Sequence, residues 1–466
     1  MKITHTLPRH PLAERSNDRF ARIIALIGFV LTVFTFYPGF LSADSLDQFG
    51  QGLNFNFSDW HLPAMAFVWS LLDTIWPGPE PMLFLQAGLY WGGVYYLTSA
   101  IPTRSAAVRC VIIALFFSPV VLNFAGVIWK DVQLAAAWSF VVGYTYALRR
   151  QGRPLRSSVK VLLLVLLAYG ALVRYNATLV VGPLFLYVLT GRPVVRRFWV
   201  TIAIYVAVVA GALASSQILN RLLAVEHTGV TDSLFVFDLA GISVRSNNNV
   251  YPFPLSPLEM DKVKTCYGKA EVVNPFIWGD CAFIWSKARP PGANTSLLGT
   301  WKSMVIHNIS AYFHHRLAHF KNFLAIPPSP PQSYLWQNGI DANNHGYKTR
   351  YHGLYHVMHG YIQIFSKTIL FRPVTWLLIS VFMILLAALP IVDSHKKNLL
   401  MVLGLSGTAY LFTYLPFGVA PDFRYAYVSI IFSIFGLCVL TPRAVALCSL
   451  YLARMGIRRS VGGRLK

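Results

Sequence analysis

Residues 23–48 read IIALIGFVLTVFTFYPGFLSADSLDQ, and this stretch decides how the rest of the chain is interpreted. An apolar window near residues 21–38 is long enough to cross a membrane, and two carboxylates, Asp44 and Asp47, follow it almost at once. Ionisable groups where a span meets water are costly, and they persist mainly where they are used. The stretch therefore predicts a membrane helix that leads into a chemically active loop.

The composition fits a membrane protein with many spans. Of 466 residues, 55% are hydrophobic and only 12% are charged, whereas a soluble domain carries about a quarter charged residues. The formal net charge of +22 first suggests nucleic acid. However, the basic residues lie in short loops between apolar runs, which is the positive-inside pattern, so nucleic acid is not an expected partner.

Ten apolar windows predict an all-α polytopic membrane protein with about ten transmembrane helices. They lie near residues 21–38, 81–99, 106–123, 132–148, 161–175, 177–190, 198–219, 372–391, 399–418 and 426–450. Ten crossings place both termini on one side. The basic clusters near 104–109, 149–160, 192–197, 396–397 and 454–466 share that side, which is therefore expected to be cytoplasmic.

This topology divides the chain into three parts. Residues 1–219 are expected to form an N-terminal module of about seven spans, with its first outer loop at 39–80. Residues 371–466 are expected to form a C-terminal module of about three spans with a basic cytoplasmic tail. Between them, 220–370 is one large periplasmic region. The predicted location is a bacterial inner membrane, so the lipid bilayer is an expected partner.

Two features of the periplasmic region carry predictions. Apolar residues recur at steps of three and four over about 298–326, with lysines and histidines between them, which predicts an amphipathic helix lying on the membrane. Its histidine-rich face is expected to meet solvent or headgroups. Cys266 and Cys281 lie together in this region. They either form a disulfide or remain as two free thiols.

Three residues of the first outer loop are candidates for catalysis and sugar binding. Asp44 and Asp47 are three apart, so on a helix they share a face. One would deprotonate an acceptor hydroxyl, while the other positions it or helps to hold a divalent cation. Gln48 would hydrogen-bond a sugar hydroxyl. The simpler alternative is a helix cap with a solvated partner.

Two further motifs follow at the same face. His61 would donate to a phosphate or relay a proton, with a structural loop histidine as the alternative. In the short turn before the fourth window, Lys130 would neutralise a lipid phosphate, and Asp131 would orient Lys130 or an acceptor. The simpler interpretation is a snorkelling lysine and a helix cap.

Two arginines complete the candidate set. Arg174 and Arg424 each stand at the outer end of a span beside a tyrosine, Tyr175 and Tyr425. Either arginine alone fits a snorkelling side chain. With Lys130 they give three cations at one depth, which suits a phosphate that gains charge as it leaves.

These residues together resemble the integral-membrane GT-C glycosyltransferases, which include protein O-mannosyltransferases and aminoarabinose transferases acting on lipid A. The family places an essential acid in the first outer loop, where Asp44 stands, and often a second acid where Asp131 stands. An uncharacterised bacterial branch has similar motifs, here Tyr37-Pro38-Gly39, His61-x-Pro63, Lys130-Asp131 and Arg424-Tyr425. The Asp-Glu pair of the mannosyltransferases is absent, since Ser45 follows Asp44, so the acceptor class does not carry over.

The resemblance implies an inverting transferase that moves a sugar from a polyprenyl-phosphate donor to a cell-envelope acceptor, which is a glycolipid, polysaccharide or protein. Asp44 would act as the base, supported by Asp47 or Asp131. Metal dependence varies within the superfamily, so a divalent cation stays open as a cofactor. Two rival interpretations are an O-antigen polymerase or ligase, which relies on arginines and a histidine, and a transporter or flippase, which needs ionisable residues near mid-span.

Overall fold

The structure is a computed structural model, and it describes residues 11–195, 197–223, 225–268, 272–290, 297–326, 335, 339–390 and 392–454. Regular secondary structure within these ranges is helical, and β-structure there is limited to three isolated bridges. The all-α prediction is therefore confirmed. The basic tail expected after residue 454 lies outside the described residues, as does Arg196 in the basic cluster near 192–197.

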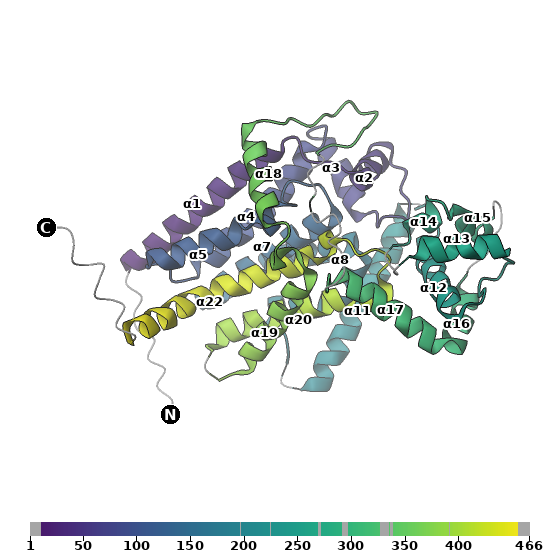
Figure 1. Ribbon diagram of the computed structural model, residues 1–466. Helices are drawn as coiled ribbons and strands as arrows, with labels where there is room; N and C mark the ends of the chain where they lie inside the picture. The colour runs from purple at the N-terminus through teal and green to yellow at the C-terminus, as the bar shows by residue number, and fades with distance from the viewer. Residues whose placement is uncertain are drawn as a thin grey trace.

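Long helices run side by side and form a bundle (Figure 1). The first helix begins and the last helix ends at the same end of this bundle (Figure 1). The bundle helices are α1 (Pro11–Phe36), α4 (Glu80–Ser99), α5 (Ala106–Phe116), α7 (Lys130–Arg150), α8 (Ser157–Val173), α10 (Gly182–Thr190), α11 (Phe198–Leu222), α19 (Pro373–Ala388), α20 (Ser394–Phe412) and α22 (Tyr427–Arg454).

Four helical segments among the described residues are long and apolar enough to cross a membrane: Asn17–Phe36, Phe198–Leu222, Ser394–Phe417 and Phe423–Ala453. Several other apolar helices are shorter, including Ala106–Leu122, Ser157–Val173 and Pro373–Ala388. The protein thus has the helices of a membrane protein, and four of the ten predicted windows correspond to helices that are both long and apolar enough to span.

Glycines allow a close helix contact in the bundle, between α4 and α7. A Cβ atom on Gly143 would lie 2.3 Å from the carbonyl oxygen of Gly93, and one on Gly93 would lie 2.6 Å from that of Ser139. Small residues let two backbones approach in this way. The contact matters for the site because α7 begins with Lys130 and Asp131.

Short helices cluster around the end of the bundle opposite the chain termini (Figure 1). They are α2 (Ala43–Asn54), α3 (Ala64–Asp73), α6 (Pro119–Leu122), α9 (Tyr175–Val180), α21 (Tyr414–Phe417) and the 3-10 helices η1 (Ile369–Phe371) and η2 (Phe423–Ala426). The first outer loop of the sequence prediction, 39–80, is thus largely helical, and it carries α2 directly after α1.

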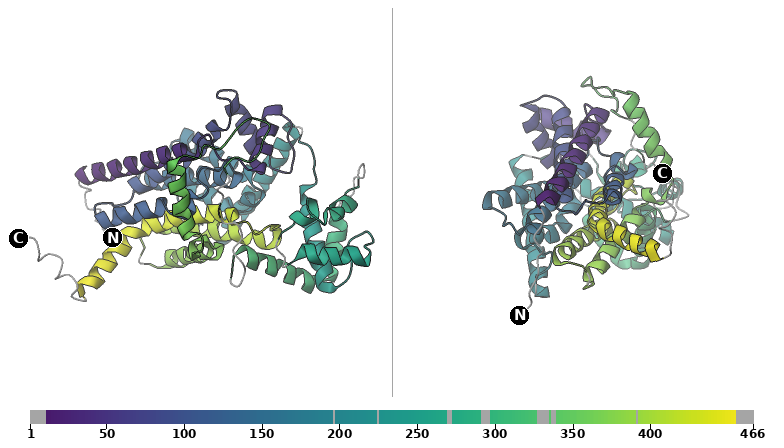
Figure 2. Two further views of the ribbon diagram at one scale, coloured as in Figure 1. Left: turned by 45° about the horizontal axis from the view of Figure 1, so that its top comes forward. Right: turned by 90° about the vertical axis from the view of Figure 1, so that its left-hand side faces the viewer.

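A subdomain with its own hydrophobic core lies beyond that end of the bundle (Figure 2, left). It consists of α12 (Val230–Ser246), α13 (Pro257–Tyr267), α14 (Asn274–Ile277), α15 (Ala282–Ala288), α16 (Leu298–His307) and α17 (Ile309–Phe323). Helix α12 is central, since most of its residues are buried.

The later part of the predicted periplasmic region packs on the bundle instead. Helix α18 (Gly353–Phe365) crosses its flank (Figure 1). Tyr361 donates a hydrogen bond to the carbonyl oxygen of Phe117, and the ring of Tyr355 contacts Phe40. Residues 220–370 therefore comprise two structural parts.

The predicted amphipathic helix at about 298–326 differs from the structure in two respects. It is broken at Asn308 into α16 and α17. The expected exposure of its histidine-rich face is wrong for part of that face, because His315 and His319 are fully buried and Arg316 is nearly so, whereas His314 is exposed. Some apolar residues of the helix are exposed instead, with Phe313 56% and Leu317 54% exposed. The polar face turns inward because a buried carboxylate, Asp238 on α12, pairs with it.

Candidate functional site

The N-terminus of α2 is fixed from three sides. Ser42 caps the helix by accepting a hydrogen bond from the backbone N–H of Ser45. The hydroxyl of Ser45 in turn donates to the carbonyl oxygen of Ile128 at 2.8 Å. A distant carboxylate, Asp341, accepts from the backbone N–H of Ala43 at 3.0 Å. The two acidic candidates that follow therefore stand on a well-anchored helix.

Asp44 and Asp47 share one face of α2, as the spacing predicted. His61 Nε2 lies 3.8 Å from Asp44 Oδ1 and 3.8 Å from Asp47 Oδ2. Asp47 also accepts a hydrogen bond from Gln51 at 2.7 Å. Its side chain is 52% exposed, whereas that of Asp44 is 32% exposed. The two partly exposed carboxylates thus flank one buried imidazole.

Arg424 brings the C-terminal part of the chain to Asp44. Its Nη2 lies 2.8 Å from Asp44 Oδ2, and its Nε lies 3.0 Å from Asp422 Oδ2. The guanidinium stacks on the ring of Trp129 at 4.5 Å, and this indole donates to Ser42 Oγ at 2.6 Å. One cation therefore connects three segments of the site.

Lys130 contacts a histidine rather than a carboxylate. Its Nζ lies 2.5 Å from His61 Nδ1. Because the ammonium group can only donate, this ring nitrogen accepts, and the N–H side of the imidazole faces the two carboxylates of α2. Lys130 and His61 thus form a polar bridge between α7 and α2.

Arg174 forms the other ion pair of the site. Its Nε and Nη2 lie 2.8 and 2.7 Å from Asp131 Oδ1. Its guanidinium stacks on Tyr425 at 4.4 Å and donates to the hydroxyl of Tyr414 at 3.2 Å. The Tyr425 ring also lies 5.4 Å from Arg424, so this ring makes cation–π contacts with both arginines.

Two predicted roles do not agree with these positions. Gln48 is buried, and its amide donates to the carbonyl oxygen of Asp44 at 3.0 Å, so it faces the protein rather than a sugar. Asp131 is 1% exposed and pairs with Arg174 instead of orienting Lys130. Both residues act in the structure as internal supports of the charged groups around them.

The two carboxylates of α2 have different electrostatic surroundings. Burial would raise the pKa of Asp44, but Arg424, His61 and Lys130 together bring it below its ordinary value. Burial, together with the negative charge of Asp44, raises the pKa of Asp47 despite the hydrogen bond from Gln51. At neutral pH, Asp47 is therefore the more basic of the pair.

The two basic groups beside them are shifted toward their neutral forms. Burial, aided by the positive charge of Arg174, lowers the pKa of Lys130 to about 7. Burial and the charge of Lys130 lower the pKa of His61 well below its ordinary value, so its imidazole is neutral. An anion placed beside Lys130 would favour its charged form.

The described residues include no group of three or more His, Cys, Asp or Glu side chains arranged to hold a metal ion. At the site itself, two carboxylates and one imidazole approach each other, but Arg424 occupies one carboxylate. The chemistry that this geometry offers most directly is proton transfer and anion binding.

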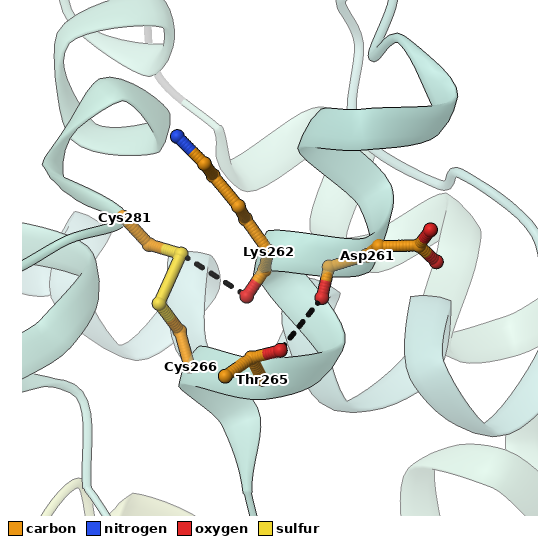
Figure 3. Close-up of a disulfide and its surroundings, with 5 residues drawn as sticks. All are labelled: Asp261, Lys262, Thr265, Cys266 and Cys281. Carbon is orange, nitrogen blue, oxygen red and sulfur yellow. Dashed lines mark hydrogen bonds between the residues drawn. A yellow bond between two sulfur atoms is a disulfide. The ribbon is translucent and has the colours of Figure 1, made fainter.

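Outside the site, the two cysteines of the subdomain are joined. Cys266 on α13 and Cys281 beside α15 form a disulfide with a Cα–Cα distance of 6.4 Å (Figure 3). The Sγ atom of Cys281 lies 3.3 Å from the carbonyl oxygen of Lys262, and Thr265 donates to that of Asp261 (Figure 3). The sequence left open either a disulfide or two free thiols, and the structure has the disulfide.

Sequence reasoning did not select four residues that shape the site. Asp422 and Trp129 stand two residues and one residue before selected cations, so their proximity was a usable signal. Tyr414 and Asp341 were harder to predict from the sequence. Tyr414 is far along the chain from its partner Arg174, and Asp341 is far from its partner Ala43. No local pattern indicates such long-range contacts.

Comparison with protein-family models, with curated proteins and with solved structures returned no match.

Proposed function

We propose that this protein is an inverting membrane glycosyltransferase of the GT-C type, which moves a sugar from a polyprenyl-phosphate donor to a cell-envelope acceptor. One observation carries the proposal. Two carboxylates on α2 and three cations from different parts of the chain, Lys130, Arg174 and Arg424, converge at one end of the bundle. A base for the acceptor and donors for a phosphate are the two requirements of such a transfer.

The proposed topology has about ten crossings, with both termini in the cytoplasm of a bacterium and the site at the periplasmic face. The spans would be α1, α4, α5 with α6, α7 beyond Asp131, α8, α9 with α10, α11, α19, α20 and α22. Two observations support this topology. The chain begins and ends at the same end of the bundle, and the short helices of the site gather at the other (Figure 1).

Asp47 is the base in this proposal, and Asp44 supports it. Neighbouring carboxylates whose pKa values are pushed apart commonly divide their roles, and the one with the higher pKa accepts the proton more readily. Asp47 is the more basic and more exposed of the two. Asp44 is engaged with Arg424, so it positions that cation instead.

Lys130 is the first contact for the donor phosphate. Arg174 and Arg424 are already paired with carboxylates, whereas Lys130 contacts the neutral imidazole of His61. A phosphate would attract the Lys130 ammonium group without displacing an ion pair. The two arginines then supply fixed positive charge nearby.

The reaction is a single displacement. The acceptor hydroxyl oxygen forms a bond to the anomeric carbon as the bond from that carbon to the phosphate oxygen breaks. The hydroxyl proton passes to Asp47, and the electron pair of the broken bond stays on the polyprenyl phosphate. Inversion follows because attack and departure occur on opposite faces of the sugar. The fixed cations lower the barrier because the phosphate gains charge as it leaves.

The test compares the surface glycans of a deletion strain complemented with wild type, Asp44→Asn, Asp47→Asn or the control Asp261→Asn. Asp261 is exposed in the subdomain, far from the proposed chemistry. Mass spectrometry is expected to show loss of one sugar unit on deletion and its recovery with wild type and the control. Asp47→Asn is expected to reduce transfer about 10²-fold or more, as removal of a general base does.

Other outcomes distinguish the rivals. Full recovery with both site variants, each present at the wild-type level, contradicts the proposal. A change only in polysaccharide chain length, insensitive to both aspartates, indicates a polymerase or ligase. Accumulation of an unaltered lipid-linked sugar on the cytoplasmic side indicates a flippase.

A further inference from the structure

One large apolar side chain of the subdomain lies open to solvent although the two residues before it are buried. Trp278, at the end of α14, is 64% exposed, whereas Phe276 and Ile277 belong to the subdomain core. Exposing an indole forgoes the free energy that burial would provide. Exposed apolar side chains with a polar surround frequently mark binding sites.

Trp278 belongs to a cluster of three indoles that reaches the proposed site. Its ring centroid lies 5.1 Å from that of Trp60, which lies 6.2 Å from that of Trp285. Trp60 directly precedes His61 in the chain. The cluster therefore joins α14 and α15 to the segment of chain that carries His61.

Polar residues lie close to Trp60 and Trp278 along the chain. Asp59, which precedes Trp60, accepts from the backbone N–H and the hydroxyl of Thr228 at 2.7 and 2.6 Å, and its other oxygen lies 3.1 Å from the ring of His227. His227 is 81% exposed in its side chain. Asp280 is also exposed, two residues after Trp278. Each of the two indoles thus has a carboxylate within two residues along the chain.

We propose that the indoles of Trp278 and Trp60 bind a saccharide, and that the acceptor is therefore a glycan chain. This inference rests on the proposed function, since it names the acceptor class of the same site. A pyranose ring has an apolar face of C–H groups and an equatorial rim of hydroxyls. The C–H face packs on an indole, while carboxylate and imidazole groups at the edge accept or donate to the hydroxyls.

A bilayer is the main alternative partner for exposed tryptophans. Two observations favour the saccharide. Trp60 follows Asp59, which is hydrogen-bonded to Thr228, and Trp278 lies two residues before the exposed Asp280. Helices α14 and α15 also lie in the subdomain beyond the end of the bundle (Figures 1 and 2).

Saccharide binding is tested without donor or turnover. Purified full-length protein in nanodiscs is applied to a printed array of bacterial polysaccharides and defined oligosaccharides, and the bound sugar is then titrated. Trp278→Ala is expected to weaken binding about tenfold, the upper range for one aromatic contact, and Trp278→Phe less. The control is Trp199→Ala on α11, which removes an indole that is 77% exposed away from the subdomain.

Three results would overturn the inference: no binding of wild type to any saccharide, equal binding by Trp278→Ala, or an equal loss in Trp199→Ala. A fourth result would also overturn it. If brominated phosphatidylcholine quenches tryptophan fluorescence in the wild type and quenches less in Trp278→Phe, that indole lies in the bilayer. If saccharide binding depends on Trp278 but no donor supports transfer, the proposed function fails and this inference stands. If transfer occurs and Trp278→Ala changes nothing, the reverse holds.

Discussion

Asp44 and Asp47 lie less than one helical turn apart, yet they have different partners. Arg424 contacts the first carboxylate, and Gln51 contacts the second. Arg424 brings the pKa of Asp44 down, whereas burial and the charge of Asp44 raise the pKa of Asp47 despite the contact with Gln51. Lys130, on the other side of His61, has a pKa of about 7 because burial disfavours its charge. These shifts give the proposed reaction a characteristic dependence on pH.

We expect a bell-shaped pH profile of kcat/KM, which reports the groups of the free enzyme. Activity should fall at low pH as Asp47 becomes protonated, with the limb above the ordinary aspartate pKa of 3.8. It should also fall as pH rises through about 7, because Lys130 loses the proton that attracts the phosphate. The measurement is sugar transfer by the purified protein in nanodiscs at constant ionic strength.

Lys130→Arg separates this explanation from a general loss of stability. Guanidinium stays charged far above neutral pH, so the alkaline limb should move upward in the variant. Lys264→Arg serves as the control, since Lys264 lies on α13 and pairs with Asp261 instead of a residue of the site, and its profile should match wild type. An alkaline limb that stays at the same pH in Lys130→Arg would exclude Lys130 as its origin.

At the scale of elements, α17 connects the subdomain to the loop that positions Arg424. Arg316 lies 2.5 Å from Asp238 Oδ1 through Nη2 and donates to the carbonyl oxygen of Gly418 through Nη1 at 2.6 Å. The backbone N–H of Val273 donates to Val419 at 2.8 Å. The subdomain thus holds residues 418–419, a few positions before Arg424, by two contacts.

Arg316→Met should destabilise the protein by about 3–5 kcal/mol, because Asp238 would remain buried without its main cation. Thermal unfolding in detergent measures this loss, and Lys321→Met on the exposed side of the same helix should change little. Adding Asp238→Asn should recover part of the stability, since an amide leaves no unpaired charge. Equal unfolding temperatures for Arg316→Met and Lys321→Met would contradict the assigned role of this ion pair.

The outward face of α17 also predicts a membrane contact. Phe320, on the same helix, meets Phe412 of the candidate span Ser394–Phe417, with ring centroids 5.6 Å apart. The exposed Phe313 and Leu317 extend this apolar surface. With Cys110, Cys438 and Cys448 replaced by serine, a nitroxide at Phe313→Cys in nanodiscs should be more accessible to oxygen than to a nickel chelate. His314→Cys, also exposed, should show the opposite preference, and a chelate-accessible label at both positions would place this face in water.

At the scale of the whole molecule, the proposed orientation can be tested by fusions. Alkaline phosphatase fused after Ser246, in the subdomain, should be active because that enzyme requires export. A green fluorescent protein after Arg454, at the end of α22, should fluoresce in the cytoplasm. Phosphatase fused after Arg150, at the end of α7, should be inactive. The reverse pattern would mean that the positive-inside assignment is wrong.

The amino-acid sequence was enough to predict an all-α membrane protein and most residues of its polar site. Long apolar windows determined helices, because a backbone in lipid must satisfy its own hydrogen bonds. Local spacing placed Asp44 and Asp47 on one face, and the position of Lys130 and Arg424 beside span ends brought both to the same end of the bundle. These are short-range properties of the chain, so they can be derived without its tertiary structure.

The pairing of the charged and polar side chains could be seen only in the folded protein. Asp131 pairs with Arg174 rather than Lys130, and Gln48 turns inward, because segments far apart in sequence supply their partners. His315 and Arg316 on α17 are buried for the same reason, since Asp238 lies opposite them on α12. An amphipathic pattern defines two faces of a helix, but the partner that packs against each face decides which of them is buried.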